Sequence, residues 1–261
     1  MLFNIQIPTP TGDDAYSLFL NNINRIDWYE ENGRPYFLKS LRQMENPLIN
    51  QMIDERKDLK KDERSYVEKF RSPFLEKLYH PERYERIAHE ILSYEDTFDK
   101  IYPKFQSMQN SWGFKIWPEY VIDLNMYVSN GSYNSNTGHI ILGVKGGGIE
   151  INPSTINLVM HEMIHLGIEK LIVRDRQGRT LLQQNEKERV VDNLCRYAGK
   201  GVFSDELLQF QKITEPFSYM DAFVREQPQK NLVQEIQRFL NKNNKTKTLI
   251  SMNNILKGKE K

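Results

Sequence analysis

A predicted helix from about Pro153 to Val173 constrains this chain more than any other segment, because it combines an apolar run with two histidines four residues apart. Asn152 can cap its first turn, and proline suits the first helical position. Residues four apart lie on one face of a helix, about one turn from each other. His161 and His165 can therefore present two imidazoles to a single metal ion.

The residue after the first histidine adds a base to this helical turn. The segment reads His161-Glu162-Met163-Ile164-His165. A glutamate in this position can face a water in the open coordination position of a catalytic zinc and accept its proton. With five histidines in the chain, the pattern arises by chance in about one such chain in a hundred. The alternative interpretation is a helix that carries two histidines by coincidence.

A catalytic zinc needs a third protein ligand, and the next predicted helix, from about Asn185 to Ala198, offers acidic side chains. Glu188 is the expected ligand. Asp192 lies four residues later and shares its face, so it can accept a hydrogen bond from the second nitrogen of a ligand histidine. The alternative for this acidic pair is an ordinary solvated helix face.

The two motifs together resemble the gluzincin pattern of thermolysin-like zinc metallopeptidases. The resemblance implies that His161, His165 and Glu188 bind one Zn²⁺ per chain, that Glu162 is the general base, and that Asp192 orients His161. It also implies a peptide or protein substrate. The metzincin class of zinc peptidases does not fit, because Ile168 and Leu171 stand where that class has a glycine and a further histidine, and Gly167 is out of phase.

The resemblance covers residues 120 to 200 and leaves the stabiliser of the oxyanion open. Thermolysin-like enzymes use a downstream histidine, and no histidine follows His165. Tyr197 and Tyr219 are the expected candidates, since a phenolic hydroxyl can donate to a developing negative charge. His139 is a further candidate.

Two strands are predicted before the zinc helix, at Tyr120–Val128 and His139–Val144. The turn-rich stretch between them suggests a hairpin with a long loop. In the gluzincin family an edge strand precedes the active-site helix and pairs with the extended substrate, and Gly138 to Val144 resembles such a strand. The expected substrate-binding residues are Gly138, His139, Ile140 and Ile141. The alternative is an ordinary core strand.

The sequence pattern in the first part of the chain predicts helices. Residues 14 to 110 are charged, poor in glycine and spaced like helices, one of which is expected from Glu82 to Phe98. Five prolines are expected to divide this stretch into segments: Pro35, Pro47, Pro73, Pro81 and Pro103. We therefore predict a helical region over 1–110, a catalytic region over 111–240 and a polar, basic tail over 241–261. The expected fold is α+β and gluzincin-like, mostly helical, with a small, mostly antiparallel sheet packed on the zinc-binding helix.

Charge and hydropathy exclude several partner classes. Lysine and arginine total 36 against 35 acidic residues, so no large basic field is present to collect nucleic acid or anionic lipid. No window approaches the length of a membrane span, and the amino terminus does not resemble a secretory signal. The single cysteine, Cys195, agrees with a reducing compartment. We expect a cytoplasmic protein that acts on neither nucleic acid nor membranes.

The expected function is hydrolysis of peptide bonds by a zinc-dependent metallopeptidase. The alternative is a zinc-stabilised binding or regulatory protein inside the cell that keeps the scaffold and cleaves nothing. The intact Glu162 favours the enzyme, because a structural metal needs no proton acceptor beside it. Substrate preference and oligomeric state have no local motif, since specificity pockets combine residues that are distant along the chain.

Overall fold

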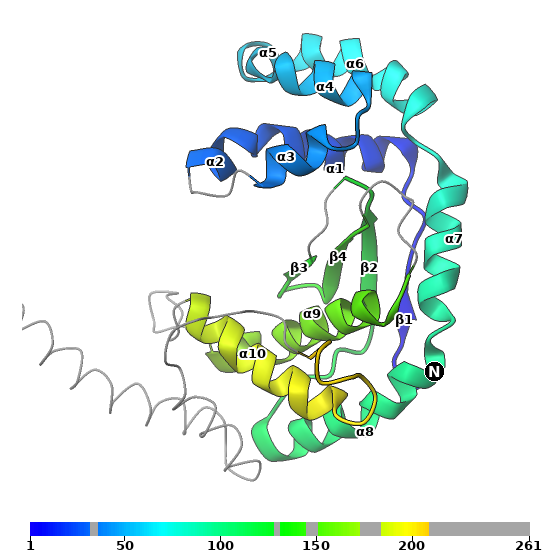
Figure 1. Cartoon of the computed structure of the whole chain (residues 1–261), viewed down its shortest axis with the longest axis vertical. Helices are drawn as coiled ribbons and strands as arrows, with labels where there is room; N and C mark the ends of the chain where they lie inside the picture. The colour runs from blue at the N-terminus through cyan, green and yellow to red at the C-terminus, as the bar shows by residue number, and fades with distance from the viewer. Residues whose placement is uncertain (32–35, 128–130, 145–150, 173–183, 209–261) are drawn as a thin grey trace, which may run out of the picture. The chain divides into compact units, whose positions relative to one another are not determined.

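The computed structural model describes residues 1–31, 36–127, 131–144, 151–172 and 184–208 (Figure 1). Most of these residues are helical and a small sheet accompanies them, which confirms the α+β class. The helices are α1 (Gly12–Asn24), α2 (Ile26–Glu31), α3 (Tyr36–Arg42), α4 (Pro47–Asp54), α5 (Arg56–Lys61), α6 (Glu63–Lys77), α7 (Pro81–Leu92), α8 (Glu95–Trp112), α9 (Pro153–Ile172) and α10 (Gln184–Gly199). The strands are β1 (Ile5–Gln6), β2 (Tyr120–Asn125), β3 (Gly131–Asn134) and β4 (His139–Gly143).

Internal contacts divide the chain into two compact units that interleave along the sequence. Unit 1 comprises Met1–Asp96 and Glu119–Glu162, and unit 2 comprises Thr97–Pro118 and Met163–Lys261. Helix α9 belongs to both, because the division falls between Glu162 and Met163. The division predicted at residues 110 and 240 stays a prediction. Among the described residues, no helix combines the length and the apolar character needed to cross a bilayer.

Unit 1 contains a mixed sheet with the strand order β1-β2-β4-β3. β1 pairs in parallel with β2, and β2 in parallel with β4, with Ile122 opposite Ile140. Only β3 and β4 are antiparallel, with Tyr133 opposite Ile140. The prediction of a mostly antiparallel sheet is therefore wrong, and so is the predicted hairpin between Tyr120–Val128 and His139–Val144.

The unpredicted strand β3 explains the difference. It lies inside the stretch that was expected to be a long loop, and a turn at its end forms the hairpin with β4 instead. Asn134 builds this turn, because its carbonyl accepts hydrogen bonds from the backbone of Thr137 and Gly138, both at 3.2 Å. Gly138 has a φ of 76°, a left-handed conformation that glycine adopts without strain.

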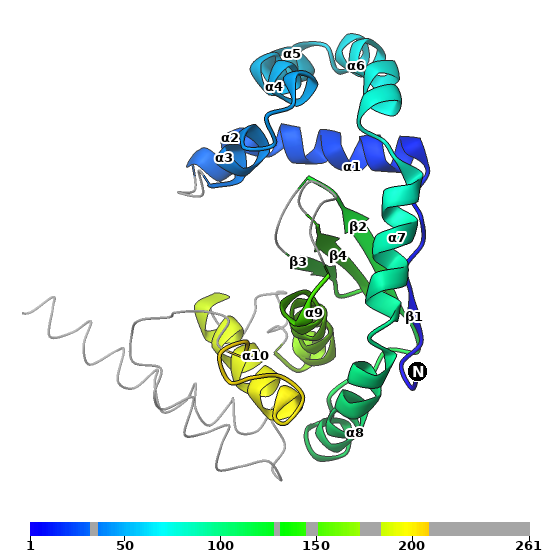
Figure 2. The same cartoon turned by 45° about the vertical axis from the view of Figure 1, so that its right-hand side comes forward.

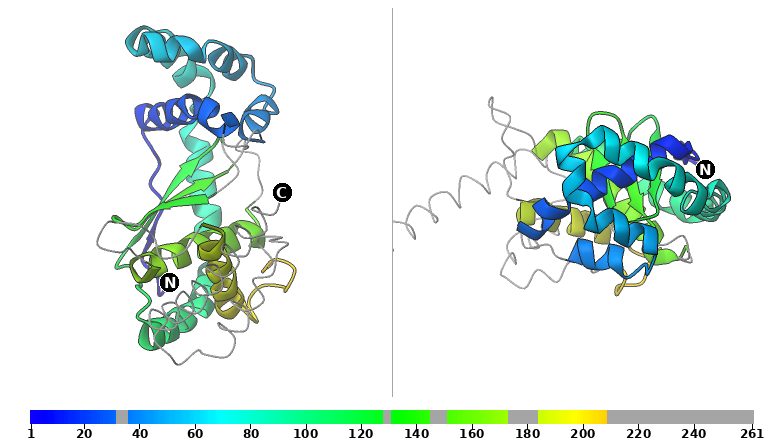
Figure 3. Two further views of the ribbon diagram at one scale, coloured as in Figure 1. Left: turned by 90° about the vertical axis from the view of Figure 1, so that its left-hand side faces the viewer. Right: turned by 90° about the horizontal axis from the view of Figure 1, so that it is seen from above.

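One face of the sheet belongs to the core of unit 1. Tyr120, Ile122 and Leu124 alternate along β2 and are buried, as are Ile140 and Leu142 on β4. Helix α7 lies behind the sheet in the left view of Figure 3. It is amphipathic, with four buried residues on one side: Tyr84, Ile87, Ala88 and Ile91.

Two of the five prolines do not end a helix. Pro47 and Pro81 begin α4 and α7 as expected, whereas Pro73 lies inside α6 and Pro103 inside α8. Packing of the buried Phe70 and Phe74 on either side of Pro73 holds α6 together despite the lost backbone hydrogen bond. Pro35 lies outside the described residues.

The helix predicted from Glu82 to Phe98 is in fact two helices. α7 ends at Leu92, and α8 begins at Glu95. Glu95 and Asp96 lie in the first turn of α8, where negative charge favours a helix start. Phe98 therefore belongs to α8.

The helices of unit 1 meet the sheet in an aromatic core. The ring of Phe19 from α1 lies 5.4 Å from Phe74 of α6 and 4.5 Å from Tyr127, which follows β2. Phe74 and Tyr127 are themselves 5.7 Å apart. Aromatic pairs at these separations stabilise a core beyond the area that they bury. The end of β2 is thereby held against α1 and α6.

Unit 2 joins α8, the second half of α9 and α10 (Figure 2). The segment after α8 contacts α9 directly, because the Lys115 amide donates to the Gly167 carbonyl at 2.9 Å and the Trp117 indole donates to the Leu166 carbonyl at 3.3 Å. α10 contacts α8 through Tyr197, whose hydroxyl donates to Ser107 Oγ at 3.1 Å. These contacts link the segment after α8 to α9, and they link α10 to α8.

Candidate metal centre

Helix α9 starts where the sequence predicts. Asn152 Oδ1 accepts hydrogen bonds from the backbone amides of Ser154 at 3.0 Å and Thr155 at 3.2 Å. This is the geometry of an N-cap, which satisfies amides that have no partner inside the helix. Pro153 follows in the first helical position. The described part of the helix ends at Ile172.

The middle of α9 is buried on nearly every side. From Val159 to Ile168, each apolar side chain is no more than 1% exposed. A helix that is apolar all round lies in a protein core. His161, Glu162 and His165 share this interior, at 5%, 5% and 2% exposure. Burying ionisable groups is costly unless they are paired or bind a metal. The burial of these three side chains therefore argues against an ordinary solvated helix face.

Helix α10 brings Glu188 to the histidines. Its core face is formed by fully buried side chains, Val190, Val191, Leu194, Cys195 and Ala198. Glu188 Oε2 lies 3.1 Å from His165 Nε2, and the Glu188 side chain is only 13% exposed. The predicted acidic ligand and one predicted histidine are therefore in direct contact.

We call His161, His165 and Glu188 the ligand group. Each can offer one ligand atom, and these atoms all lie within 4.8 Å of one another. Two imidazoles and a carboxylate are donors that divalent transition metals accept. The structure thus brings together the three predicted ligands in an arrangement that could hold a metal ion.

An ion pair links α9 and α10 next to the ligand group. Lys187 Nζ donates to Glu169 Oε2 at 3.1 Å, and the side chains are 10% and 12% exposed. Lys187 directly precedes Glu188, and Glu169 lies one helical turn after His165. This pair was not predicted from the sequence, because the facing of two helices is not a local property.

Asp192 is buried, at 2% exposure, one turn after Glu188 on α10. It therefore lies in the interior and on the face that the sequence predicts. Its assigned role of orienting His161 stays a prediction.

Glu162 approaches the first residue of β3. A Cβ atom on Gly131 would lie 2.3 Å from Glu162 Oε1, far closer than non-bonded atoms approach. Gly131 lies in the turn-rich stretch that was expected to be a long loop. In the structure the carboxylate of Glu162 occupies the space that a side chain at position 131 would need, so a larger residue there would displace this carboxylate.

Close packing also explains a glycine in the second half of α9, Gly167. A Cβ on Gly167 would lie 2.0 Å from Phe114 Cζ. The ring of Phe114 is 1% exposed and packs edge-on against Phe105 at 5.1 Å. Gly167 therefore lets the segment after α8 approach the helix that carries the histidines.

The predicted oxyanion donor Tyr197 is not brought to the ligand group. It lies nine residues after Glu188, which places it on the opposite side of α10. Its hydroxyl contacts Ser107, and Lys104 Nζ lies 5.4 Å from the centre of its ring. The oxyanion role of Tyr197 therefore finds no support in these contacts. The other candidate, Tyr219, lies outside the described residues.

Strand β4 is not the predicted edge strand. It pairs with β2 on one side and with β3 on the other, so both of its backbone edges are already hydrogen-bonded. The expectation that an extended substrate pairs with Gly138, His139, Ile140 and Ile141 is therefore wrong. β3 forms one edge of the sheet, and β1 forms the other.

The other three histidines are not members of the ligand group. His139 Nδ1 lies 2.9 Å from Asp123 Oδ2 on the neighbouring strand, and both side chains are about 40% exposed. His80 Nδ1 lies 3.4 Å from Glu82 Oε1, and His89 is an exposed residue of α7.

Comparison with known proteins adds no assignment to this geometry: no family model, no curated protein and no solved structure matches the chain.

Proposed function

We propose that this chain is a zinc-dependent metallopeptidase of the gluzincin type. The observation that carries the proposal is the ligand group, in which the ligand atoms of His161, His165 and Glu188 lie within 4.8 Å of one another in a buried setting. Two histidines and one glutamate are the donor set of catalytic zinc in thermolysin-type enzymes, which leaves a fourth position for water or substrate.

The spacing of the donors supports zinc. Zn–N and Zn–O bonds of about 2.0–2.2 Å in a tetrahedron place neighbouring ligand atoms about 3.4 Å apart. His165 Nε2 and Glu188 Oε2 are 3.1 Å apart, which is close to this spacing. His161 lies one turn earlier on the same helix, and its ligand atom lies within 4.8 Å of those of His165 and Glu188.

Zinc held by this group would polarise a carbonyl oxygen and lower the pKa of a water molecule. Glu162 is adjacent to a ligand in the sequence and is 5% exposed. Its carboxylate is proposed to take a proton from the attacking water and to pass it to the leaving amine. Asp192 is proposed to accept a hydrogen bond from His161 and so to fix the orientation of that ring.

The sheet edge supports a peptide substrate. β3 is an edge strand, and its first residue, Gly131, lies against Glu162. An extended peptide that pairs with a sheet edge is held by backbone hydrogen bonds, which makes binding tolerant of sequence. A peptide along β3 would pass beside the proposed general base.

The metal is tested by elemental analysis of the purified protein after dialysis against zinc. The parent and an Asp205→Ala control, which removes an exposed carboxylate, should bind about one zinc per chain. Glu188→Ala should weaken binding by at least about tenfold, because one of three protein ligands is lost. A parent that takes up no zinc would overturn the metal centre.

The reaction is tested with a peptide library and Glu162→Gln. The parent should cleave peptides, and Glu162→Gln should lower kcat by about 10²–10⁴-fold, the usual contribution of a general base, while zinc content stays the same. If the parent binds zinc but cleaves no more than Glu162→Gln does, the peptidase proposal fails and the non-catalytic zinc-stabilised protein is the better account.

A further inference from the structure

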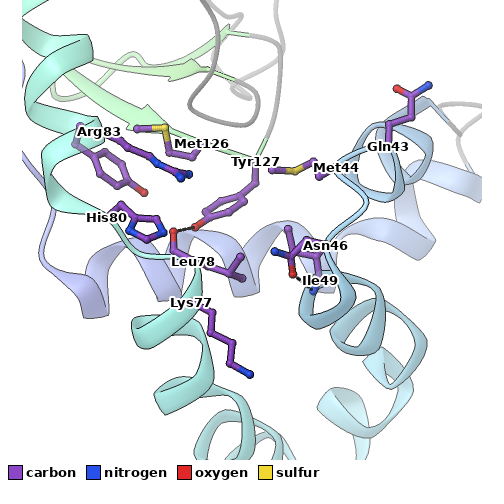
Figure 4. A pocket seen from close by; sticks show the side chains of 11 residues that line it. Gln43, Met44, Asn46, Ile49, Lys77, Leu78, His80, Arg83, Met126 and Tyr127 are labelled. Carbon is purple, nitrogen blue, oxygen red and sulfur yellow. Dashed lines mark hydrogen bonds between the residues drawn. The ribbon is translucent and has the colours of Figure 1, made fainter.

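A cavity of about 440 Å³ lies in unit 1, and none of the ligand group lines it. Its walls come from the α3–α4 connection and α4, from the end of α6, from α7 and from the residues after β2 (Figure 4). Pockets for small molecules usually span about 300–1,000 Å³. The cavity is therefore large enough for a ligand of modest size.

The lining of this cavity is basic on one side. Lys77, Arg83 and the imidazole of His80 line it, and among the described residues no aspartate or glutamate does. In Figure 4 the Arg83 side chain extends toward the ring of Tyr127, and His80 lines the same cavity. Among the described residues, the Arg83 guanidinium forms no ion pair. A cationic group that faces a cavity without a carboxylate partner favours an anionic ligand.

The remaining wall is mostly apolar. Four aliphatic and thioether side chains contribute to it, namely Met44, Ile49, Leu78 and Met126. Ile49 is fully buried and Met126 is 5% exposed, so this wall is an extension of the core. Methionine side chains adapt their shape to a bound molecule. This wall suits the hydrocarbon part of a ligand.

Two tyrosines also line the cavity and, like the uncharged Gln43 and Asn46, leave its charge positive. Burial raises the pKa of Tyr84 to about 12, and burial also raises the pKa of Tyr127. Both phenols are therefore neutral at physiological pH. The Tyr127 hydroxyl donates to the Leu78 carbonyl at 3.5 Å, a long hydrogen bond that a ligand oxygen near the phenol can replace.

We propose that this cavity binds a small amphipathic anion, in which a carboxylate, sulfonate or phosphate meets Arg83 and His80 and an apolar body contacts Met44, Leu78 and Met126. The proposal does not depend on the metal centre. Polar groups that fix orientation, combined with an apolar wall that supplies contact area, are the usual composition of a small-molecule site.

Binding is tested with the fluorescent probe 1-anilinonaphthalene-8-sulfonate, an aromatic sulfonate, titrated into the folded full-length chain. Arg83→Ala should weaken the 1:1 affinity by about tenfold, which corresponds to one charge-assisted hydrogen bond. The matched control is Arg86→Ala on the same helix, an exposed arginine that pairs with Glu90, and its affinity should equal that of the parent. Equal affinities for the parent and Arg83→Ala would overturn the site.

The chemical class is tested by displacing the probe. Decanoate should compete at least about tenfold better than decanol, because only the carboxylate meets the arginine, and it should also compete better than inorganic phosphate, which has no apolar part. Decanol competing as well as decanoate would overturn the choice of an anion. Phosphate competing as well as decanoate would overturn the role of the apolar wall.

The location is tested by nuclear magnetic resonance of ¹³C-labelled methionine methyl groups. Decanoate should shift the signals of Met44 and Met126, assigned through Met44→Leu and Met126→Leu, and should leave Met108 of α8 unchanged. Because this readout follows individual side chains, it separates binding in the cavity from binding elsewhere. Unchanged Met44 and Met126 signals under saturating decanoate would overturn the proposal.

Discussion

Lys187 of α10 and Glu169 of α9 form a hydrogen-bonded ion pair of 3.1 Å in which neither side chain is more than 12% exposed. Each residue is close in sequence to a proposed ligand, Lys187 to Glu188 and Glu169 to His165. Groups just outside a metal site orient the ligands and tune affinity for the metal. We infer that this pair aligns the two helices at the ligand group.

Lys187→Met should lower the free energy of unfolding by about 2–4 kcal/mol, because it leaves the buried carboxylate of Glu169 without its cation. Zinc affinity should fall by about tenfold as the alignment of Glu188 is relaxed. Urea unfolding and competition with a chelator measure the two effects.

The double variant Glu169→Leu/Lys187→Met is the informative control. It removes both charges, so it should recover stability to within about 1 kcal/mol of the parent. Arg64→Ala, which breaks an exposed pair with side chains 89% and 65% exposed, should change stability by less than about 0.5 kcal/mol. A double variant no more stable than Lys187→Met alone would show that the pair does not carry the effect.

Gly131→Ala should impair catalysis more than folding. The new Cβ would lie 2.3 Å from Glu162 Oε1, so the carboxylate must move away from its present position. A displaced general base should lower kcat by at least about tenfold, whereas zinc content should remain at the parent level. Ser132→Ala, at the next and exposed residue of β3, is the matched control and should behave like the parent. Unchanged kcat in Gly131→Ala would contradict the role of Glu162.

Local sequence signals were sufficient to predict the helices that carry the site. The cap at Asn152 and the apolar run predicted the start of α9, and the helix predicted from about Asn185 to Ala198 corresponds to α10. These signals depend on a few neighbouring residues, and they report on backbone hydrogen bonds that close within one turn. The three proposed ligands then follow from helical periodicity.

Strand pairing could not be predicted in the same way. β3 reads Gly131-Ser132-Tyr133-Asn134, without the alternating apolar residues of a core strand, because it lies at the edge of the sheet and is half exposed. Because β3 forms the hairpin with β4, β2 pairs with β4 in parallel instead of as its hairpin neighbour. Pairing of this kind depends on contacts between residues that are distant along the chain.

The requirement for glycine at two positions has the same non-local origin. Gly131 is constrained by Glu162, and Gly167 by Phe114, in each case by a residue more than thirty positions away. In the sequence alone both glycines look like ordinary loop or helix residues. Only the packed structure shows which atoms occupy the missing side chain's space.

Gly167→Ala should destabilise the fold through overpacking. The Cβ would lie 2.0 Å from the buried ring of Phe114, and both the ring and the helix are held by neighbours. We expect a loss of about 1–3 kcal/mol in the free energy of unfolding, measured with urea. The double variant Gly167→Ala/Phe114→Leu should lose less stability than the sum of the losses measured for Gly167→Ala and Phe114→Leu separately. Strict additivity of the two changes would show that the residues do not clash.

Buried tyrosines should make the folded chain less stable at alkaline pH. Burial raises the pKa of Tyr84 from 10.0 to about 12 in the folded chain. The fold therefore favours the neutral phenol, and the unfolded chain loses its proton first as pH rises. The stability that Tyr84 contributes is fully present below pH 10, which is the unfolded pKa, and is lost as pH rises from 10 toward 12.

Tyr84→Phe should reduce this alkaline loss because it keeps the ring and removes the ionisable hydroxyl. Between pH 10 and pH 11 the parent should lose about 1 kcal/mol more than Tyr84→Phe does, as measured by urea unfolding at each pH. Burial raises the pKa of Tyr127 as well, and Tyr127 is still present in the variant. The stability of Tyr84→Phe should therefore still fall as pH rises, but less steeply than that of the parent. Identical pH dependence in the parent and Tyr84→Phe would contradict a buried, neutral phenol at this position.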